Sequence, residues 1–249
     1  MEDYHVAEYK YENDHELGLF AIYDGHLGDT VSSFLKANLF NNILKEPLFW
    51  TNPQEAIKNA YSSTNKYILE NSKQLGPGGS TAVTAIVVDG RDMWVANIGD
   101  SRAVVCERGT AIQVSVDHEP HTADERKRIE KQGGFVSTFP GDVPRVNGQL
   151  AVARAFGDQS LKAHLSSEPD FKHVPINSNI EFVILASDGL WKVCALAFLG
   201  KFHLHCVMLL FTHHITKFIS DNYVLDNFRF GHPFILVCIY FFLWKITII

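Results

Sequence analysis

The chain is poor in cysteine: 249 residues include only four, at positions 106, 194, 206 and 238. No two of them have the spacing of a disulfide framework or a zinc site, so both kinds of site are excluded. We interpret the four as reduced packing residues in a reducing compartment. The first residues are acidic and polar, and they show no signal peptide. Together these features favour the cytoplasm or the nucleus.

The sequence also lacks any run of lysine and arginine, and its formal net charge is -6. A nucleic-acid-binding protein needs a basic patch, so the composition argues against nucleic acid as a partner. The apolar run at residues 234–244 is shorter than the roughly 20 residues that a membrane-spanning helix needs, and Lys245 interrupts it. We therefore expect no membrane partner, and we expect a monomer.

Apolar residues make up 46% of the chain, enough to bury a sizeable core. The nearly continuous apolar run from Leu17 to Tyr23 predicts a strand that is covered on both faces. It stops at Asp24-Gly25, and a helix is predicted after it. The predicted inner face of that helix has helical spacing and consists of Val31, Phe34, Leu35, Leu39 and Ile43.

Start signals predict a second helix: Asn52 as cap, Pro53 in the first turn and Glu55 two residues later. Residues 80–88 and 93–97 flank a turn and predict a β-hairpin. Further strands are predicted at residues 103–106, 112–116 and 181–186, and a capping box at Thr122 predicts a helix up to Gly133. Hairpin-linked strands with a few amphipathic helices indicate an α+β sandwich.

Carboxylates recur in turns at or near strand ends. Asp24 and Asp188 each follow an apolar strand, Asp100 and Asp158 lie in glycine-containing turns, and Glu2-Asp3 stands near the start. Hard divalent cations prefer such oxygen ligands, and repulsion makes a carboxylate cluster costly without a cation. Any single Asp-Gly can equally be an ordinary turn. These spacings alone leave a metal site and a set of plain turns about equally supported.

A series of motifs runs through the first 193 residues. They are Met1-Glu2-Asp3; residues 20–26, ending Asp24-Gly25-His26, with Gly28; residues 79–82 (GSTA); residues 96–102 (ANIGDSR); Asp117-His118; residues 153–158 (ARAFGD); and residues 186–191 (ASDGLW). In this order they resemble the metal-dependent protein phosphatases of the PPM (type 2C) family, with plant-like details. The resemblance implies an α+β fold with a central antiparallel β-sandwich flanked by helices.

The same resemblance implies the site. Asp24 would bridge two metal ions, Mg²⁺ or Mn²⁺, with the Gly25 carbonyl and Glu2 supporting one ion and Asp188 holding the other. Asp3 would be a supporting acid, and Asp100 would belong to a weaker third site. His26, together with Asp24 and Asp188, would carry catalysis, with His26 as general acid. The implied partners are phosphorylated protein substrates.

That chemistry is hydrolysis of phosphoserine and phosphothreonine. Two metal ions about 3.5–4 Å apart lower the pKa of a shared water and stabilise phosphoryl charge in the transition state. A histidine with an ordinary pKa near 6.5 can protonate the leaving oxygen at neutral pH.

The sequence departs from the family pattern at both ends. No residue matches the arginine that family members carry shortly before the first motif, and a guanidinium is the usual clamp for phosphate. The resemblance stops at Val193. We therefore expect residues 1–193 to be a partial catalytic domain, incomplete at its C-terminus. Residues 194–249 are expected to be a divergent hydrophobic tail that is no native domain, has lost the final metal-ligating aspartate and leaves strand edges bare.

Two functions follow as hypotheses. The first is a protein serine/threonine phosphatase that uses Mg²⁺ or Mn²⁺ and is impaired by the truncation. The alternative is a catalytically inactive protein that still binds phosphoproteins or kinases.

Overall fold

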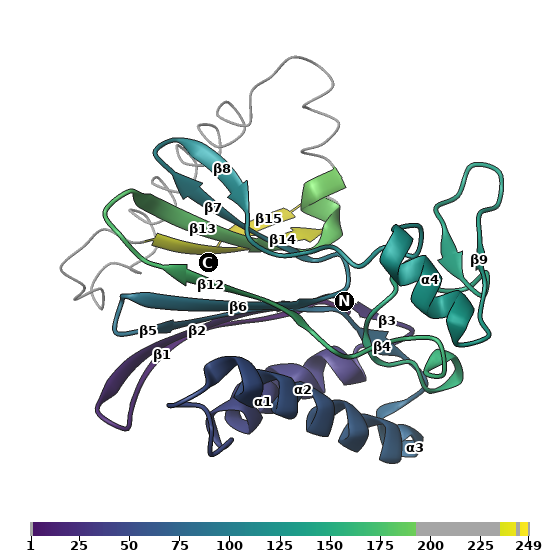
Figure 1. Ribbon diagram of the computed structural model, residues 1–249, viewed down its shortest axis with the longest axis horizontal. Coiled ribbons are helices and arrows are strands. Elements are labelled where there is room, and N and C mark those ends of the chain that lie inside the picture. The colour runs from purple at the N-terminus through teal and green to yellow at the C-terminus, as the bar shows by residue number, and fades with distance from the viewer. Residues whose placement is uncertain (1, 193–234, 243–244, 249) are drawn as a thin grey trace.

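The computed structural model describes residues 2–192, 235–242 and 245–248. Its main feature is two five-stranded sheets packed face to face, with helices on the outside (Figure 1). The first sheet has the order β1-β2-β5-β6-β12, built from Tyr4–Glu12, His15–Tyr23, Ala82–Val88, Asp92–Ile98 and Asp170–Pro175. All its neighbouring strands are antiparallel. This confirms the predicted α+β sandwich.

The second sheet has the order β15-β14-β13-β7-β8, built from Lys245–Ile248, Ile235–Phe242, Ile180–Ala186, Arg102–Glu107 and Thr110–Gln113. β14 runs parallel to β13, and the other pairs are antiparallel. The expected bare edge of β13 therefore carries two more strands. Most of the expected tail, 194–249, lies outside the described residues.

Strand β2 shows why its sequence is apolar throughout. Alternate residues from Leu17 to Tyr23 belong to the core beneath the helices, whereas Phe20 and Ile22 belong to the core between the sheets. A strand with cores on both faces cannot alternate polar and apolar side chains. The prediction of a doubly covered strand is confirmed.

Helices α1 (Thr30–Leu44) and α2 (Pro53–Glu70) cover the outer face of the first sheet (Figure 1). Asn52 caps α2 as predicted, because its side chain accepts a hydrogen bond from the Glu55 amide at 3.3 Å. The short helices α3 (Ser72–Leu75) and η1 (Gln159–Leu161) lie in connections. Within residues 2–192, no helix combines the length and the apolar character needed to cross a bilayer.

Short elements gather at one end of the sandwich. β3 (Gly25–His26), β4 (Gly79–Ser80) and β11 (Phe156–Gly157) form a small sheet of order β11-β4-β3. Beyond it lie α4 (Ala123–Lys131) and the pair β9 (Val136–Ser137) and β10 (Arg145–Val146) (Figure 1). This end of the molecule carries the predicted site residues.

Three sequence-based predictions need correction. Strands β1 and β12 were not predicted, because both are partly exposed and lack a continuous apolar run. The strand expected at residues 112–116 lies at 110–113. The capping box at Thr122 does not form: the Thr122 hydroxyl donates to the Glu119 carbonyl, while Glu125 binds two arginines. Those buried ion pairs compete successfully with the cap.

Candidate functional site

The strand register brings four aspartates to one end of the sandwich. Antiparallel pairing of Tyr4 with Tyr23 sets Asp3 beside Asp24, just beyond both strands. Pairing of Ala186 with Arg102 brings the segment after β13 next to the segment before β7. Asp188 and Asp100 stand in those two segments. We call Asp3, Asp24, Asp100 and Asp188 the acidic cluster.

The pKa of Asp24 is strongly shifted. Withdrawal from water and repulsion by Asp3, Asp188 and Asp100, in that order, raise its pKa to about 9. Its carboxyl also forms a hydrogen bond with Asp3, whose pKa is raised chiefly by burial. Two carboxyl groups can share a hydrogen bond only when one of them carries a proton. A bound cation would replace that proton.

Asp100 and Asp188 complete the cluster from the second sheet. Burial, then repulsion by Asp188, raises the pKa of Asp100 to about 7. Asp188 begins a short helical segment, residues 188–192, and the Trp191 indole donates to the Ala186 carbonyl at 3.0 Å. That bond ties the segment to the end of β13. The Lys192 ammonium pairs with the Asp188 carboxylate, and its own pKa is raised by Asp188, Asp100 and Asp24 against the effect of burial.

Gly25 and Glu2 meet on the other side of Asp24. A Cβ atom on Gly25 would lie 2.4 Å from the Glu2 carbonyl oxygen, so only glycine permits this approach. The Glu2 carboxylate accepts a hydrogen bond from the Gly28 amide at 2.7 Å. Glu2 is thus adjacent to the predicted site, and its carboxylate is engaged by the turn before α1.

The donor set suits a hard divalent cation. Four carboxylates held together at a cost in free energy, with a backbone carbonyl available at Gly25, are the oxygen ligands that Mg²⁺ and Mn²⁺ prefer. Within the described residues no three acidic, histidine or cysteine side chains are arranged to hold an ion directly.

His26 lies on β3, two residues after Asp24. Its Nε2 contacts both oxygens of Asp158, at 2.8 and 2.9 Å, and the Asp158 side chain is only 3% exposed. Asp158 therefore does not join the acidic cluster, although it stands in the same kind of glycine turn. Sequence reasoning counted Asp158 among the carboxylates that could hold a cation, and the family resemblance gave it no role. Nothing in its local motif shows which histidine it reaches.

Hydroxyl groups link the two sheets beside the site. The Thr81 and Ser101 hydroxyls are 2.7 Å apart and both residues are buried. The Thr81 hydroxyl also accepts from the Asp24 amide at 3.4 Å, and the Thr81 amide donates to the Asp24 carbonyl at 2.9 Å. The GSTA and GDSR motifs thus hold the backbone that carries Asp24 and Asp100.

Comparison with known proteins gives close relatives in plants. The chain is 88% identical over 193 residues to the Oryza sativa subsp. japonica protein named "Probable protein phosphatase 2C 44", covering 78% of this chain and 60% of the relative. It is 61% identical over 193 residues to the Arabidopsis thaliana "Probable protein phosphatase 2C 9", covering 78% and 68%. The chain thus spans 60% of the length of the rice protein.

Solved structures share the fold. A Caenorhabditis elegans sex determining protein matches with a TM-score of 0.65 and 26% identity, over 77% of this chain and 52% of the other. A serine-threonine phosphatase 2C from Toxoplasma gondii matches with a TM-score of 0.66 and 23% identity, over 77% and 83%. The model of the family described as protein phosphatase 2C matches residues 1–197. The chain belongs to the protein phosphatase 2C family.

Proposed function

We propose that this chain is a metal-dependent protein serine/threonine phosphatase acting on phosphoserine and phosphothreonine of protein substrates in the cytoplasm or nucleus. The observation that carries the proposal is the acidic cluster, in which repulsion and burial raise the Asp24 pKa to about 9. Such an arrangement destabilises the fold unless a cation compensates it, and perturbed pKa values of this kind cluster at functional sites. We place the catalytic domain at residues 1–193.

Each residue then has a defined task. Asp24 and Asp188, with Asp3, Glu2 and the Gly25 carbonyl in support, would hold two ions of Mg²⁺ or Mn²⁺, and Asp100 would hold a weaker third. Bound ions of this kind lower the pKa of a shared water and offset phosphoryl charge. His26 holds the proton that the leaving seryl or threonyl oxygen needs.

The decisive experiment measures phosphate release from a phosphothreonine peptide with Mn²⁺, Mg²⁺ or excess chelator. We expect turnover only with metal, and a loss of at least about 100-fold in kcat for Asp24→Asn, since the variant removes charge stabilisation from the transition state. Asp92→Asn is the matched control, because Asp92 lies at the opposite end of β6 from Asp100. Metal-independent turnover, or an unchanged Asp24→Asn variant, would refute the proposal.

A second candidate is a protein that binds phosphoproteins or kinases without hydrolysing them. The observation that favours it is the ion pair between Lys192 and Asp188, which places an ammonium where a metal ion would compete. This candidate predicts that the chain retains a phosphopeptide in the presence of chelator and releases no phosphate when metal is added. Calorimetric titration of Mn²⁺ into the chain separates the two, because only the enzyme requires a saturable metal site.

A further inference from the structure

His26 and Asp158 come from opposite edges of the small sheet and meet across its central strand. β3 pairs with β4 through His26 and Gly79, and β11 pairs with β4 through Gly157 and Gly79. A Cβ on Gly79 would lie 2.1 Å from the Asp158 carboxylate. The absence of a side chain at Gly79 therefore lets the carboxylate cross the sheet to the imidazole.

Asp158 itself is held in an uncommon conformation. Its φ is +54°, in the left-handed region that side chains other than Asn and Asp rarely adopt. Its amide donates to the Gly78 carbonyl at 3.0 Å, and the neighbouring Gly157 amide donates to the Asn65 side chain of α2 at 3.1 Å. The backbone around Asp158 is thus anchored from two sides, and it aims the carboxylate at Nε2 of His26.

The contacts of the buried Asp158 side chain show which residue it serves. Its side chain is almost fully buried, and the neighbouring Lys162 ammonium donates to the Ala155 carbonyl at 2.6 Å. Burying a carboxylate costs free energy unless it is hydrogen-bonded and paired. Both of its oxygens lie within 3 Å of one histidine nitrogen, so this histidine is the partner that its position serves.

We propose that Asp158 is the positioning residue of the general acid His26: it holds the Nε2–H and leaves Nδ1 as the atom that delivers the proton. The inference rests on the proposed phosphatase function. When water attacks phosphorus, the bond from phosphorus to the seryl or threonyl oxygen breaks. That oxygen takes the proton from Nδ1, and a neutral imidazole remains, with Nε2–H still donating to Asp158.

Two substrates separate positioning from a merely structural role. A phosphothreonine peptide has an alkoxide leaving group that needs a proton, whereas p-nitrophenyl phosphate releases a stable phenolate that needs none. For Asp158→Asn we expect kcat to fall about 10- to 100-fold on the peptide and to stay within about threefold on p-nitrophenyl phosphate. Asparagine suits the left-handed backbone, so the variant keeps its fold.

His26→Asn and the double variant complete the cycle. Because Asp158 acts only through His26, adding Asp158→Asn to His26→Asn should lower peptide turnover no further. The matched control is Asp89→Asn, since Asp89 also has a positive φ, of 51°, and contacts His15 at 2.6 Å. We expect that control to keep both activities within about twofold. Equal losses on both substrates, no loss on the peptide, or additive losses in the double variant would overturn the proposal.

The tautomer of His26 gives a readout that does not depend on turnover. In ¹⁵N-labelled protein we expect the proton on Nε2 of His26 in the unsubstituted chain and a mixture of tautomers in Asp158→Asn. If the unsubstituted chain hydrolyses neither substrate, the phosphatase proposal fails, and this spectrum alone decides the role of Asp158. An unchanged tautomer in Asp158→Asn would refute the positioning role.

Discussion

Two groups of carboxylates illustrate opposite ways of keeping negative charge out of water. Glu125 of α4 lies between two guanidinium groups, and its side chain is only 6% exposed. Arg154 holds one oxygen at 2.6 and 2.8 Å, and Arg128 holds the other at 2.8 and 3.1 Å. These bonds outweigh burial and lower the Glu125 pKa. In the acidic cluster burial and repulsion act together, and the pKa of Asp24 rises to about 9.

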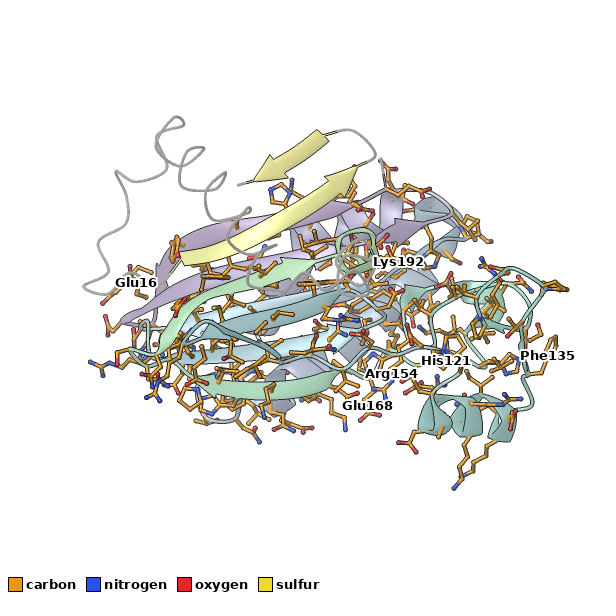
Figure 2. The ribbon with its side chains drawn as sticks, turned by 90° about the horizontal axis from the view of Figure 1, so that it is seen from above. Glu16, His121, Phe135, Arg154, Glu168 and Lys192 are labelled. Atoms are coloured by element: carbon orange, nitrogen blue, oxygen red, sulfur yellow. The ribbon has the colours of Figure 1, made fainter. Side chains whose placement is uncertain are left out.

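The two groups have different roles: the ion pairs of Glu125 hold the fold together, whereas the acidic cluster is suited to binding a ligand. Arg154 lies between the sandwich and the part of the chain that carries α4 and β9, and its Nη1 also donates to the Glu168 carbonyl at 2.8 Å (Figure 2). The Glu125 group therefore fastens two parts of the molecule together. In the acidic cluster, by contrast, four carboxyl groups share the single ammonium of Lys192 among the described residues, and that ammonium pairs with Asp188 alone. Fully paired charges support a structure, whereas a cluster with an excess of negative charge indicates a place for a ligand of opposite charge.

The largest effect is expected from breaking the ion pairs of Glu125 with Arg128 and Arg154. Glu125→Gln leaves two partly buried guanidinium groups without their anion, and we expect the free energy of unfolding to fall by about 3 kcal/mol. Urea denaturation measures this change in the free energy of unfolding. The matched control on the same helix is Glu130→Gln, which breaks an exposed pair with Arg126 and should cost less than about 1 kcal/mol. Equal costs for the two variants would show that the Glu125 group is no stronger than a surface pair.

The next effect is the pH dependence of the metal-free chain. Asp24 and Asp100 have folded-state pKa values of about 9 and about 7, both above the unfolded value of 3.8. Between about pH 4 and pH 9 the unfolded state therefore binds fewer protons than the folded state, and stability falls as pH rises. We therefore expect the free energy of unfolding to fall steadily from pH 5 to pH 9 in chelator.

Metal should remove most of that loss, because a bound cation compensates the ionised cluster. Glu125 has the opposite sign: its lowered pKa makes its contribution disappear only as the solution becomes acidic. Thermal unfolding at each pH, with chelator and with Mn²⁺, tests both statements. A metal-free stability that rises from pH 5 to pH 9 would contradict the assignment of the acidic cluster.

A smaller effect is expected from neutralising one member of the cluster. Asp24→Asn replaces a carboxyl group that must either take up a proton or bear repulsion from Asp3, Asp188 and Asp100. We expect the metal-free chain at pH 8 to gain about 1–3 kcal/mol in unfolding free energy while it loses turnover, as happens when a functional site is costly to the fold. Denaturant midpoints in chelator measure the gain. A destabilised Asp24→Asn would mean that the carboxylate has a structural partner.

Much of this architecture was predictable from local pattern. The strand at Leu17–Tyr23 and the cap at Asn52 depend on neighbours in sequence, and both formed as expected. We expected Asp24, Asp100 and Asp188 to lie close together because of their places at strand ends and in family motifs. The strand register brings them to the same end of the sandwich. The contact of Asp158 with His26 was not predictable, because it spans 132 residues and depends on the bare backbone of Gly79.

At Thr122 a local pattern predicted a capping box that does not form in the structure. Its local pattern was correct, yet Glu125 is taken by Arg154, which lies 29 residues later and was invisible to a local rule. Long-range ion pairs that form on folding can override a preference of about 1 kcal/mol at a helix start.

The smallest expected effect concerns the cation that the acidic cluster already has. Lys192, labelled in Figure 2, pairs with Asp188, and its side chain is 66% exposed, so solvent screens much of the attraction. An ammonium on Asp188 competes with a metal ion for the same oxygens.

We therefore expect Lys192→Gln to tighten Mn²⁺ binding about two- to fivefold by calorimetry in the absence of substrate, whereas Lys192→Arg keeps the wild-type affinity. The matched control is Lys66→Gln, because Lys66 forms the same i,i+4 pair with Glu70 on α2, away from the site. If Lys192→Gln weakens Mn²⁺ binding, the ammonium supports the metal site rather than competing with it, and the contrast with the fully paired Glu125 group becomes one of degree.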